Sequence, residues 1–377
     1  MTASAPNYGG SISGRPRDAA AELVDLARRI DCGRPPSAEV ELLSVVIPCY
    51  NESEGLAELH RRVTAVCRDV VGNAYELILV NDGSRDASWD EMVELAHLDA
   101  RLVCIDLSRN HGHQVALTAG LTIARGSHIL ILDADLQDPP ELLSAMLERM
   151  GQGFDVVYGQ RRARAGETWF KRTSASLFYR LIDRMSDVAI PRDTGDFRLM
   201  SRRALDQLLA MPESFRFIRG MVSWIGYRQS ALLFDRDARF AGKTHYPLRR
   251  MLRFAVDAIT SFSIAPLRMA SHLGMIAAVG SLAMIAFLIA AWASGDTVPG
   301  WTSLAALILF VGGTQLFMLG IIGEYVGRMY LESKRRPLFT IQSIITGEAV
   351  MTQSEGPARA LQQAVQERFG ASGVNHG

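Results

Sequence analysis

Two carboxylates, Asp133 and Asp135, stand one residue apart directly after an apolar run at residues 128–132. Such a run is typical of a strand buried on both faces of a sheet, and Pro139 and Pro140 suit the first turn of a helix that follows. Carboxylates fit a core poorly, but they fit the crevice at the carboxyl ends of strands where open α/β sheets bind ligands. There they would hold a hard divalent cation, which would hold a diphosphate. An ordinary solvated loop is the alternative, and the Asp-x-Asp spacing alone would favour it.

Three further polar segments follow predicted strands. They are Pro-Cys-Tyr-Asn-Glu at 48–52, Asn-Asp-Gly-Ser-Arg-Asp at 81–86 and Ser-Arg-Asn-His-Gly-His-Gln at 108–114. Acidic and amide groups in the first two suit the base and ribose hydroxyls of a nucleotide better than its phosphates, although residues 81–84 alone could form an Asx turn. The chain has no GxGxxG after its first strand and no GxxxxGK[ST], which disfavours a dehydrogenase and a P-loop hydrolase.

The elements that must position these groups alternate from residue 42 to about residue 160. Apolar periodicity predicts strands at 43–47, 75–80, 102–107, 129–132 and 155–158, and helices at 53–71, 87–98, 114–124 and 141–150. This alternation predicts a mostly parallel sheet covered by helices on both faces. Right-handed crossovers would then place the four polar loops on one rim.

Three motifs in this order carry a family resemblance: Val-Val-Ile-Pro-Cys-Tyr-Asn-Glu (45–52), Val-Asn-Asp-Gly-Ser-Arg-Asp (80–86) and Asp-Ala-Asp-Leu-Gln-Asp-Pro-Pro-Glu (133–141). They resemble the family 2 glycosyltransferases, which implies a Rossmann-like GT-A fold of the α/β class. More narrowly, residues 42–340 resemble the polyprenyl-phosphate glycosyltransferases, among them dolichyl-phosphate mannose synthases, bacterial undecaprenyl-phosphate glucosyltransferases and aminoarabinose-type transferases. The resemblance implies transfer of one sugar from a nucleotide sugar to polyprenyl (undecaprenyl or decaprenyl) phosphate, with inversion.

The resemblance also implies which residues hold the nucleotide. The first two loops would place Pro48, Tyr50 and Glu52 around the base and ribose. The second loop of the family usually begins Asp-Asp, whereas this chain has Asn81 and Asp82. The amide of Asn81 can still donate and accept hydrogen bonds at a pyrimidine edge.

The same resemblance assigns the metal and the phosphates. Asp133, Asp135 and Gln137 would bind Mg²⁺ or Mn²⁺ and through it the diphosphate, so that the metal neutralises the leaving group. Asp133 would thereby also contact the nucleotide, and Asp135 would be catalytic. Arg161 matches the Gly-x-Arg of the family, which reaches the phosphates, and it too would be catalytic. A surface arginine at the end of a strand is the alternative.

Asp196 lies in a Gly-Asp-Phe-Arg segment that the family shares, and its expected role is catalytic. It could act as a base or orient the acceptor. A phosphate monoester is mostly ionised near pH 7, so this nucleophile needs little help from a general base. A buried ion pair between Asp196 and Arg198 is the competing structural account.

Contacts to the acceptor phosphate are expected from Arg172, Ser176, Arg239 and Lys243. The first two lie on an amphipathic segment at 169–185, which would rest on an anionic membrane surface or pack on the domain as a lid. The other two belong to Arg-x-x-Gly-Lys-Thr-His-Tyr at 239–246, which matches a basic loop of the family. Such a loop would close over phosphates.

Two uncharged apolar runs, 272–294 and 302–323, each reach the length of a bilayer-spanning helix. Only residues 295–301 separate them, so they would form a hairpin, and a buried soluble hairpin is the alternative. The connection has no Lys or Arg, whereas both outer ends are flanked by Arg and Lys. The positive-inside rule therefore predicts a protein of the cytoplasmic (inner) membrane, with the catalytic domain and both termini in the cytoplasm.

The predicted organisation is an N-terminal extension at 1–40, disordered or briefly helical, a GT-A domain at 41–246, an interfacial helix at 247–271, the spans within 272–330 and a cytoplasmic tail at 331–377. Residues 345–377 are expected to be a loose part of that tail. Glycines at 312, 313, 320 and 323 allow close helix packing, so a homo-oligomer is expected.

Composition narrows the partners. The formal net charge of zero does not argue for nucleic acid. Cys32, Cys49, Cys67 and Cys104 lack metal-ligand or CxxC spacing, and we expect reduced thiols in a cytosolic compartment.

Rival functions stay open at this point. A processive polysaccharide synthase typically has more spans and a Gln-x-x-Arg-Trp motif, and neither is present. A catalytically dead scaffold is disfavoured by the intact Asp133 and Asp135 pair. UDP-glucose is the favoured donor, because the Arg-Asn-His-Gly loop at 109–112 resembles the bacterial glucosyltransferases. GDP-mannose and a UDP-N-acetylhexosamine are the other candidates.

Overall fold

The computed structural model describes residues 40–162, 191, 194–235, 265–294, 300–346 and 349–352. Four predicted acceptor contacts lie outside the described residues: Arg172, Ser176, Arg239 and Lys243. Nearly all of the predicted N-terminal extension and most of the predicted interfacial helix also lie outside them.

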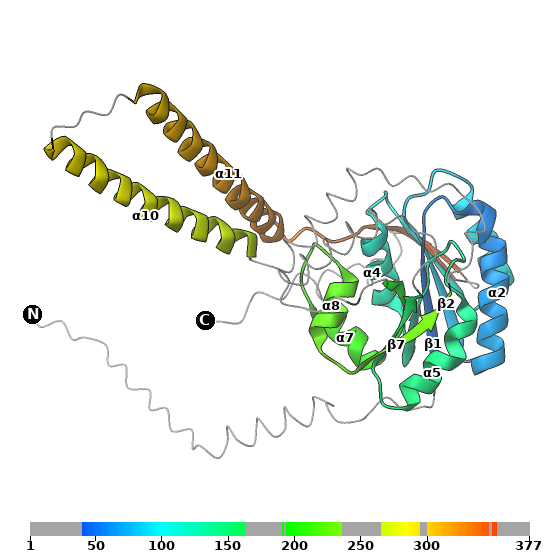
Figure 1. Ribbon diagram of the computed structural model, residues 1–377. Helices are drawn as coiled ribbons and strands as arrows, with labels where there is room; N and C mark the ends of the chain where they lie inside the picture. Colours follow the sequence, from blue (N-terminus) through cyan, green and yellow to red (C-terminus); the bar gives the residue numbers. More distant parts are fainter. Residues whose placement is uncertain are drawn as a thin grey trace, which may run out of the picture.

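A nine-stranded sheet, in the order β7-β5-β6-β4-β1-β2-β3-β8-β9, forms the centre of the described α/β domain (Figure 1). The strands are β1 (Leu43–Cys49), β2 (Tyr75–Asn81), β3 (Leu102–Leu107), β4 (His128–Ile131), β5 (Val156–Arg161), β6 (Thr194–Ser201), β7 (Gln229–Phe234), β8 (Ile341–Thr346) and β9 (Ala349–Thr352). β1 pairs in parallel with both β2 and β4, β2 with β3, and β5 with β7. The other pairs are antiparallel: β4 with β6, β5 with β6, β3 with β8, and β8 with β9.

The prediction of a mostly parallel sheet is therefore wrong, because the sheet is mixed. The apolar pattern of a strand reports burial on its two faces, but it does not report the direction of its neighbours. β6 enters between β4 and β5 against their direction, and on the other side of the sheet β8 pairs antiparallel with β3. Both contributions come from segments outside the regular strand–helix alternation.

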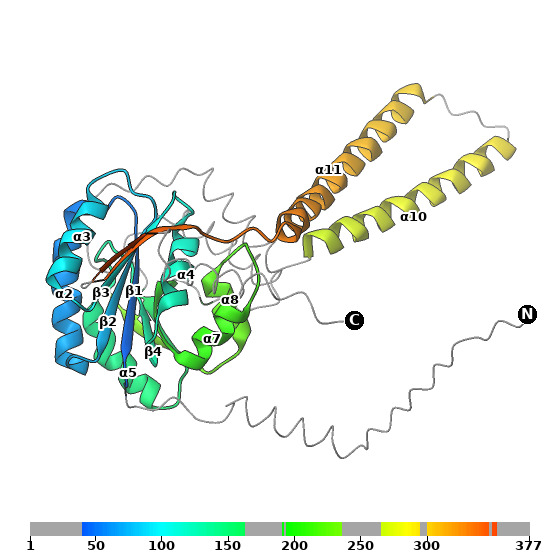
Figure 2. The same ribbon diagram turned by 180° about the vertical axis from the view of Figure 1, so that it is seen from behind.

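Helices cover both faces of the sheet, as predicted (Figures 1 and 2). One face carries α2 (Ser53–Val71), α3 (Ser88–Leu98) and α5 (Leu143–Gly151), the last preceded by a 3₁₀ turn at Pro140–Leu142. The other face carries α4 (His113–Ile123), α7 (Arg202–Ala210) and α8 (Ile218–Ile225). Because side chains alternate along a strand, Val45 of β1 joins the first core and Val46 joins the second.

Two sequence features fit the centre of this sheet. Pro48 lies in the central strand β1 and has no N–H to donate to a neighbouring strand. The proline is tolerated because β4 pairs with β1 only as far as Val46. Residue 120 is glycine because a Cβ there would lie 2.5 Å from Val46 Cγ1, so α4 packs closely on the sheet.

The chain then forms two long helices, α10 (Ala265–Ala293) and α11 (Trp301–Ser333), which project from the α/β domain as a hairpin (Figure 1). Both exceed the predicted spans, by about two turns at the start of α10 and by almost three at the end of α11. Among the described residues, one stretch, Pro266–Ala291, is long and apolar enough to cross a membrane by its length and composition. The second span stays a prediction.

The predicted loose tail is wrong at its start. Residues 341–346 and 349–352 form β8 and β9, which extend the sheet beyond β3. The apolar side chains of Ile341, Ile344 and Ile345 are buried there. This segment is short and follows the helix hairpin, so its partner strand lies more than 230 residues earlier and its own pattern does not reveal the pairing.

Candidate functional site

The four polar loops lie on one rim of the sheet, as predicted, and hydrogen bonds join the first three of them. The backbone N–H of Asn51 donates to Ser84 Oγ across 3.0 Å, and the N–H of Arg85 donates to Asn51 Oδ1 across 2.8 Å. Asn51 adopts a left-handed conformation (φ 55°), which asparagine tolerates better than most residues. The first and second loops therefore form one rigid corner beside the ends of β1 and β2.

The predicted nucleotide residues of the first loop have different exposures. Pro48 is buried in β1, whereas the Tyr50 ring is 42% exposed at the rim. Glu52 is half-buried, and its backbone N–H donates to Ser88 Oγ across 2.9 Å. Of the three, Tyr50 offers the largest free surface to a base or ribose, and its contact with a nucleotide stays a prediction.

Asn81 and Asp82 are buried and bound within the protein. Asn81 Nδ2 donates to Asp106 Oδ1 across 2.7 Å, and Asn81 Oδ1 accepts the N–H of Ser84. The two carboxylate oxygens of Asp82 accept the backbone N–H groups of His111 (2.7 Å) and Gly112 (3.0 Å). These contacts give both residues the role of holding the rim loops, and a direct contact with the nucleotide base stays a prediction.

Gly83 brings the second and third loops into contact. Its φ of +64° is left-handed, and a Cβ would lie 2.6 Å from both Arg109 C and Asn110 N. Only glycine avoids both the strain and the clash. The glycine therefore allows the 108–114 loop to close down on the second loop.

Asp133 lies at the carboxyl end of β4 with its side chain 25% exposed. Its Oδ1 is buried and has no hydrogen-bond partner within the described part of the chain. Burial raises the pKa of this carboxyl to about 6, His113 opposes the rise, and the nearby carboxylates of Asp196, Asp138 and Asp135 add to it. A half-buried carboxylate with one buried oxygen, close to other carboxylates, fits a position that binds positive charge.

The rest of this loop is held tightly. The backbone N–H of Gln137 donates to Asp135 Oδ1 across 3.2 Å, and both side chains are half-buried. Between them Leu136 adopts φ 55°, a left-handed conformation that is strained for leucine, with its side chain buried in the core. Such a conformation persists only where the surroundings hold it, so the packing of Leu136 in the core fixes the loop that carries Asp135 and Gln137.

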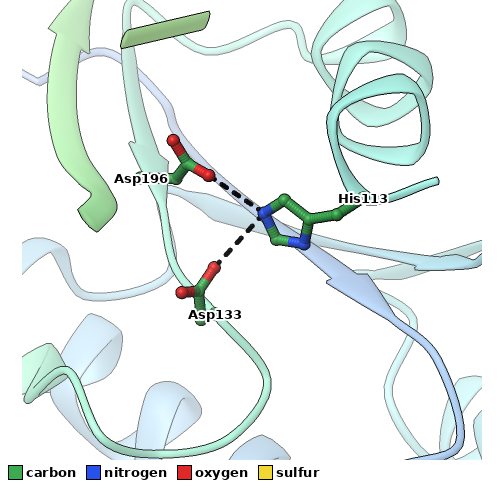
Figure 3. A group of neighbouring side chains, drawn as sticks. All are labelled: His113, Asp133 and Asp196. Atoms are coloured by element: carbon green, nitrogen blue, oxygen red, sulfur yellow. Dashed lines mark hydrogen bonds and ion pairs between the residues drawn. The ribbon is translucent and has the colours of Figure 1, made fainter. Parts of the chain in front are cut away.

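His113 bridges Asp133 and Asp196 (Figure 3). Its Nε2 lies 3.1 Å from Asp196 Oδ2 and 3.6 Å from Asp133 Oδ1, and both carboxylates point toward the ring. His113 is the first residue of α4, and its side chain is 44% exposed. Burial alone would lower the pKa of His113, but the hydrogen bond to Asp196 and the two negative charges raise it.

Asp196, at 3% side-chain exposure, is the most enclosed member of this cluster. Its Oδ1 accepts Nε of Arg219 across 2.9 Å, and its Oδ2 accepts Nε2 of Gln114 across 2.7 Å. Burial alone would raise the pKa of Asp196, but Arg219, His113 and Arg198 together hold it well below its ordinary value. Asp196 is therefore an ionised anchor for three cationic or polar partners.

The predicted ion pair between Asp196 and Arg198 is present at 3.8 Å, which is longer than the contact with Arg219. Arg198 also donates to the backbone oxygens of Asp196 (3.1 Å) and Gly195 (3.2 Å). Burial lowers the pKa of Arg198 to about 10, although Asp196 opposes this effect. The ion pair with Arg198 thus explains part of the environment of Asp196, but Arg219 is the closer positive charge.

Arg161 ends β5 and is 29% exposed. Its Nη2 lies 3.6 Å from the fully buried Asp138 Oδ1, and a Cβ on Gly195 would come within 3.0 Å of the same nitrogen. Arg161 therefore lies beside the residue that precedes Asp196. Its contact with phosphates stays a prediction.

Three functional side chains had no assigned role in the sequence analysis: His113, Gln114 and Arg219. The first two belong to the third polar loop, so their position in a predicted rim loop was an available indication. Arg219 gave no such indication, because its contact with Asp196 depends on the placement of α8 after α7.

The residues present fit a divalent cation. Ligand atoms of His113, Asp133 and Asp196 all lie within 4.8 Å of one another. Both oxygens of Asp196 already accept hydrogen bonds, whereas Asp133 Oδ1 accepts none from the described residues, so Asp133 is the better ligand. Asp135 follows one residue later, and carboxylate oxygens are ligands that hard cations prefer.

Comparisons with known proteins identify relatives of the chain. Residues 44–209 match the model of Glycosyl transferase family 2, and residues 265–329 match that of the GtrB C-terminal hairpin. The chain is 46% identical over 300 residues to the Uncharacterized glycosyltransferase YkcC of Bacillus subtilis (strain 168), covering 79% of this chain and 93% of that protein. It is 36% identical over 308 residues to the Prophage bactoprenol glucosyl transferase homolog of Escherichia coli (strain K12), covering 80% and 99%. It is also 36% identical over 307 residues to the Bactoprenol glucosyl transferase of Shigella phage SfV, covering 80% and 98%.

Proposed function

The chain belongs to glycosyl transferase family 2, and from that premise we propose that it transfers a single sugar from a nucleotide sugar to polyprenyl phosphate. The protein is a glycosyltransferase, and its α/β domain with a mixed sheet has the GT-A fold. The two relatives named for bactoprenol glucosyl transfer support glucose as the sugar and a bactoprenol-type lipid as the acceptor. UDP-glucose is the donor we propose on that basis.

One observation carries the proposal: Asp133 presents a buried oxygen without a hydrogen-bond partner in the described residues, at the rim of the sheet among other carboxylates. Together with Asp135 and Gln137 it would hold Mg²⁺ or Mn²⁺. When bound, the cation would neutralise the charge of the leaving nucleoside diphosphate. Arg161 would add a cationic contact to the same phosphates.

The residues of the chain itself organise the rest of the reaction. An oxygen of the acceptor phosphate forms the bond to the anomeric carbon as the bond from that carbon to the diphosphate breaks, with inversion. The nucleophile is already ionised near pH 7 and releases no proton. Asp196, which is also ionised and held by Arg219, therefore orients His113 and Gln114 rather than accepting a proton. Arg172, Ser176, Arg239 and Lys243 are the proposed contacts of the acceptor phosphate.

We place the reaction at the cytoplasmic face of the inner membrane, with α10 and α11 as two spans. The apolar stretch Pro266–Ala291 and the exposed apolar side chains along both helices, such as Ile276 and Phe310, support this placement. The loop between the helices has no Lys or Arg, which supports the proposed orientation. A homo-oligomer in the membrane is also part of the proposal.

Sugar transfer in detergent extract tests the proposal directly. Undecaprenyl phosphate would be incubated with a panel of labelled UDP- and GDP-sugars and Mg²⁺ or Mn²⁺. We expect a mild-acid-labile glucolipid from UDP-glucose with wild type and none with Asp133→Asn or Asp135→Ala. Asp69→Asn, an exposed carboxylate on α2, is the matched control and should transfer normally.

The outcomes separate the rival functions. A lipid product from another donor would correct the sugar but support the reaction class. A long polymer instead of a single-sugar lipid would favour a processive synthase. Failure of wild type to bind any nucleotide in the presence of metal would favour a scaffold without catalytic activity.

A further inference from the structure

The last turns of α11 contact residues 211–217, which connect α7 to α8. Both oxygens of the Glu332 carboxylate accept hydrogen bonds from Ser214, one from its backbone N–H (2.8 Å) and one from its hydroxyl (2.7 Å). One helical turn earlier, the guanidinium of Arg328 lies 4.8 Å from the centre of the Phe215 ring. Because a carboxylate that receives two donors from one residue fixes both distance and direction, the Glu332–Ser214 pair is a rigid link.

The same loop, residues 211–217, is also held by hydrogen bonds to α7 of the α/β domain. Arg216 is buried and donates to the backbone oxygens of Met211 (2.6 Å) and Leu208 (2.9 Å), at the end of α7. These bonds satisfy carbonyl groups that a helix end leaves without partners. The loop is therefore rigid, and the position of Ser214 determines where α8 starts.

The start of α8 holds the reactive cluster. The backbone N–H of Ile218, four residues after Ser214, donates to Gln114 Oε1 across 2.9 Å, and Gln114 Nε2 donates in turn to Asp196. Arg219, the next residue, donates from Nε to the other oxygen of Asp196 and from Nη1 to the backbone oxygen of Thr194. Both oxygens of Asp196 are thus held by groups whose positions depend on the start of α8.

We propose that Glu332 and Ser214 form a clamp, defined by these two residues, that positions Gln114 and Arg219 around Asp196. The helix hairpin that anchors the protein thereby sets the geometry of the site at which the sugar is transferred. Glu332 and Ser214 are positioning residues, since neither touches the reactive cluster. The inference rests on the proposed function for its kinetic test, and on the structure alone for its test by hydrogen exchange.

The kinetic test uses full-length protein in bilayers that contain polyprenyl phosphate. Glu332→Ala should lower kcat roughly 10- to 100-fold, as small misplacements of reactive groups do, while KM for the nucleotide sugar changes less than about twofold. Glu332→Gln, whose amide can still accept the Ser214 N–H, should keep most of the turnover. Ser214→Ala loses only the hydroxyl contact and should lie between wild type and Glu332→Ala.

Glu324→Ala is the matched control, because Glu324 lies two turns earlier on α11, is 50% exposed, and within the described residues forms its ion pair with Arg328 across one turn. It should leave kcat and KM unchanged. A parallel fall in kcat for Glu332→Ala and Glu324→Ala, or no fall for either, would overturn the clamp.

Hydrogen exchange gives an answer that does not need the reaction. The amides of Ile218 and Met221, which donate to Gln114 Oε1 and to the backbone oxygen of Phe217, should exchange about tenfold faster in Glu332→Ala than in wild type. They should exchange at the wild-type rate in Glu332→Gln and Glu324→Ala. Unchanged exchange at these amides in Glu332→Ala would refute the clamp whatever the kinetics. If wild type transfers no sugar to any lipid phosphate, the proposed function fails, and exchange alone decides the clamp.

Discussion

Nε of Arg219 donates to Oδ1 of Asp196 across 2.9 Å, and this contact joins α8 to the first residues of β6. Asp196 is almost completely enclosed, so its charge is compensated by neighbouring residues more than by water. The cationic neighbours hold its pKa well below the ordinary value against the opposing effect of burial. A carboxylate with such a low pKa is a weak base. Asp196 acts instead as a fixed negative charge that orients its partners.

Asp196→Asn should therefore act mainly through structure. The substitution removes the negative charge that Asp196 places beside Arg219 and the buried Arg198, and breaking a buried pair in this way costs about 3–5 kcal/mol. Urea unfolding of the detergent-solubilised protein would measure the loss, with Asp69→Asn as an exposed control. If Asp196 were instead a general base, Asp196→Asn would fold with nearly wild-type stability and lose only turnover.

His113→Ala should lower sugar transfer by about 10²-fold, since it removes a preorganised donor and positive charge from between two carboxylates. The Nε2 of glutamine can reach a position similar to that of the histidine Nε2, so His113→Gln should recover part of the activity through the bond to Asp196. Steady-state transfer to lipid phosphate would measure both. His97→Ala, an exposed histidine on α3, is the control. Equal activities of His113→Ala and His97→Ala would exclude a role for the bridge.

Much of the fold was predictable from local patterns. The apolar runs of β1 to β4 and the helical spacing in α2 identify buried elements without reference to anything distant, and their alternation places the polar loops on one rim. The Asp133 loop is likewise predictable, because it directly follows such an apolar run. The thiols of Cys49, Cys67 and Cys104 are buried, as their positions in predicted strands and helices indicate.

What the sequence did not reveal depends on contacts between distant segments. β8 joins the rest of the sheet through its pairing with the distant β3. β6 has the burial pattern of a parallel strand although both neighbours run against it. The roles of His113 and Arg219 likewise arise where the ends of α4 and α8 meet Asp196. No spacing within one segment encodes such a meeting.

Asn81 occupies the position where the family usually has aspartate, and the structure provides a reason. Its amide donates to Asp106 Oδ1 across 2.7 Å, from β2 to the neighbouring β3. Asn81→Asp would set two buried carboxylates against each other, and we expect a loss of about 2–3 kcal/mol in the free energy of unfolding. Adding Asp106→Asn should restore most of it, and a double-mutant cycle by urea unfolding measures the coupling.

The pH dependence of Asn81→Asp has a definite sign. Two facing carboxylates raise the pKa of one of them in the folded state above its value in the unfolded chain. The stability linked to that group is complete below the unfolded pKa, near 4, and is lost as the pH rises through the folded pKa. The deficit of the variant should therefore shrink between pH 7 and pH 5. A deficit that is constant over this range, or that persists after Asp106→Asn is added, would contradict the explanation.

The buried thiols give a final prediction. Burial raises the pKa of Cys67 and of Cys104 to about 12, and it raises that of Cys49 well above its ordinary value. Because the thiolate is the reactive form, folded Cys32→Ser protein should react with a thiol reagent at pH 8 only as fast as it unfolds. A rapid reaction of even one thiol would contradict the assignment.

The sign of the linked stability follows from the same pKa values. A thiol in the unfolded chain titrates near pH 8.5, so the stability linked to Cys67 and Cys104 is complete below that pH and falls as the pH rises toward 12. Each thiol should contribute about 1 kcal/mol of loss per pH unit in this window. Urea unfolding of Cys32→Ser at pH 8, 9 and 10, compared with Cys32→Ser/Cys67→Ala, isolates the contribution of Cys67. The double variant should begin less stable, because of the cavity left by the missing sulfur, and should show the shallower decline with pH. Identical slopes for the two proteins would mean that the Cys67 thiol titrates alike in the folded and unfolded states.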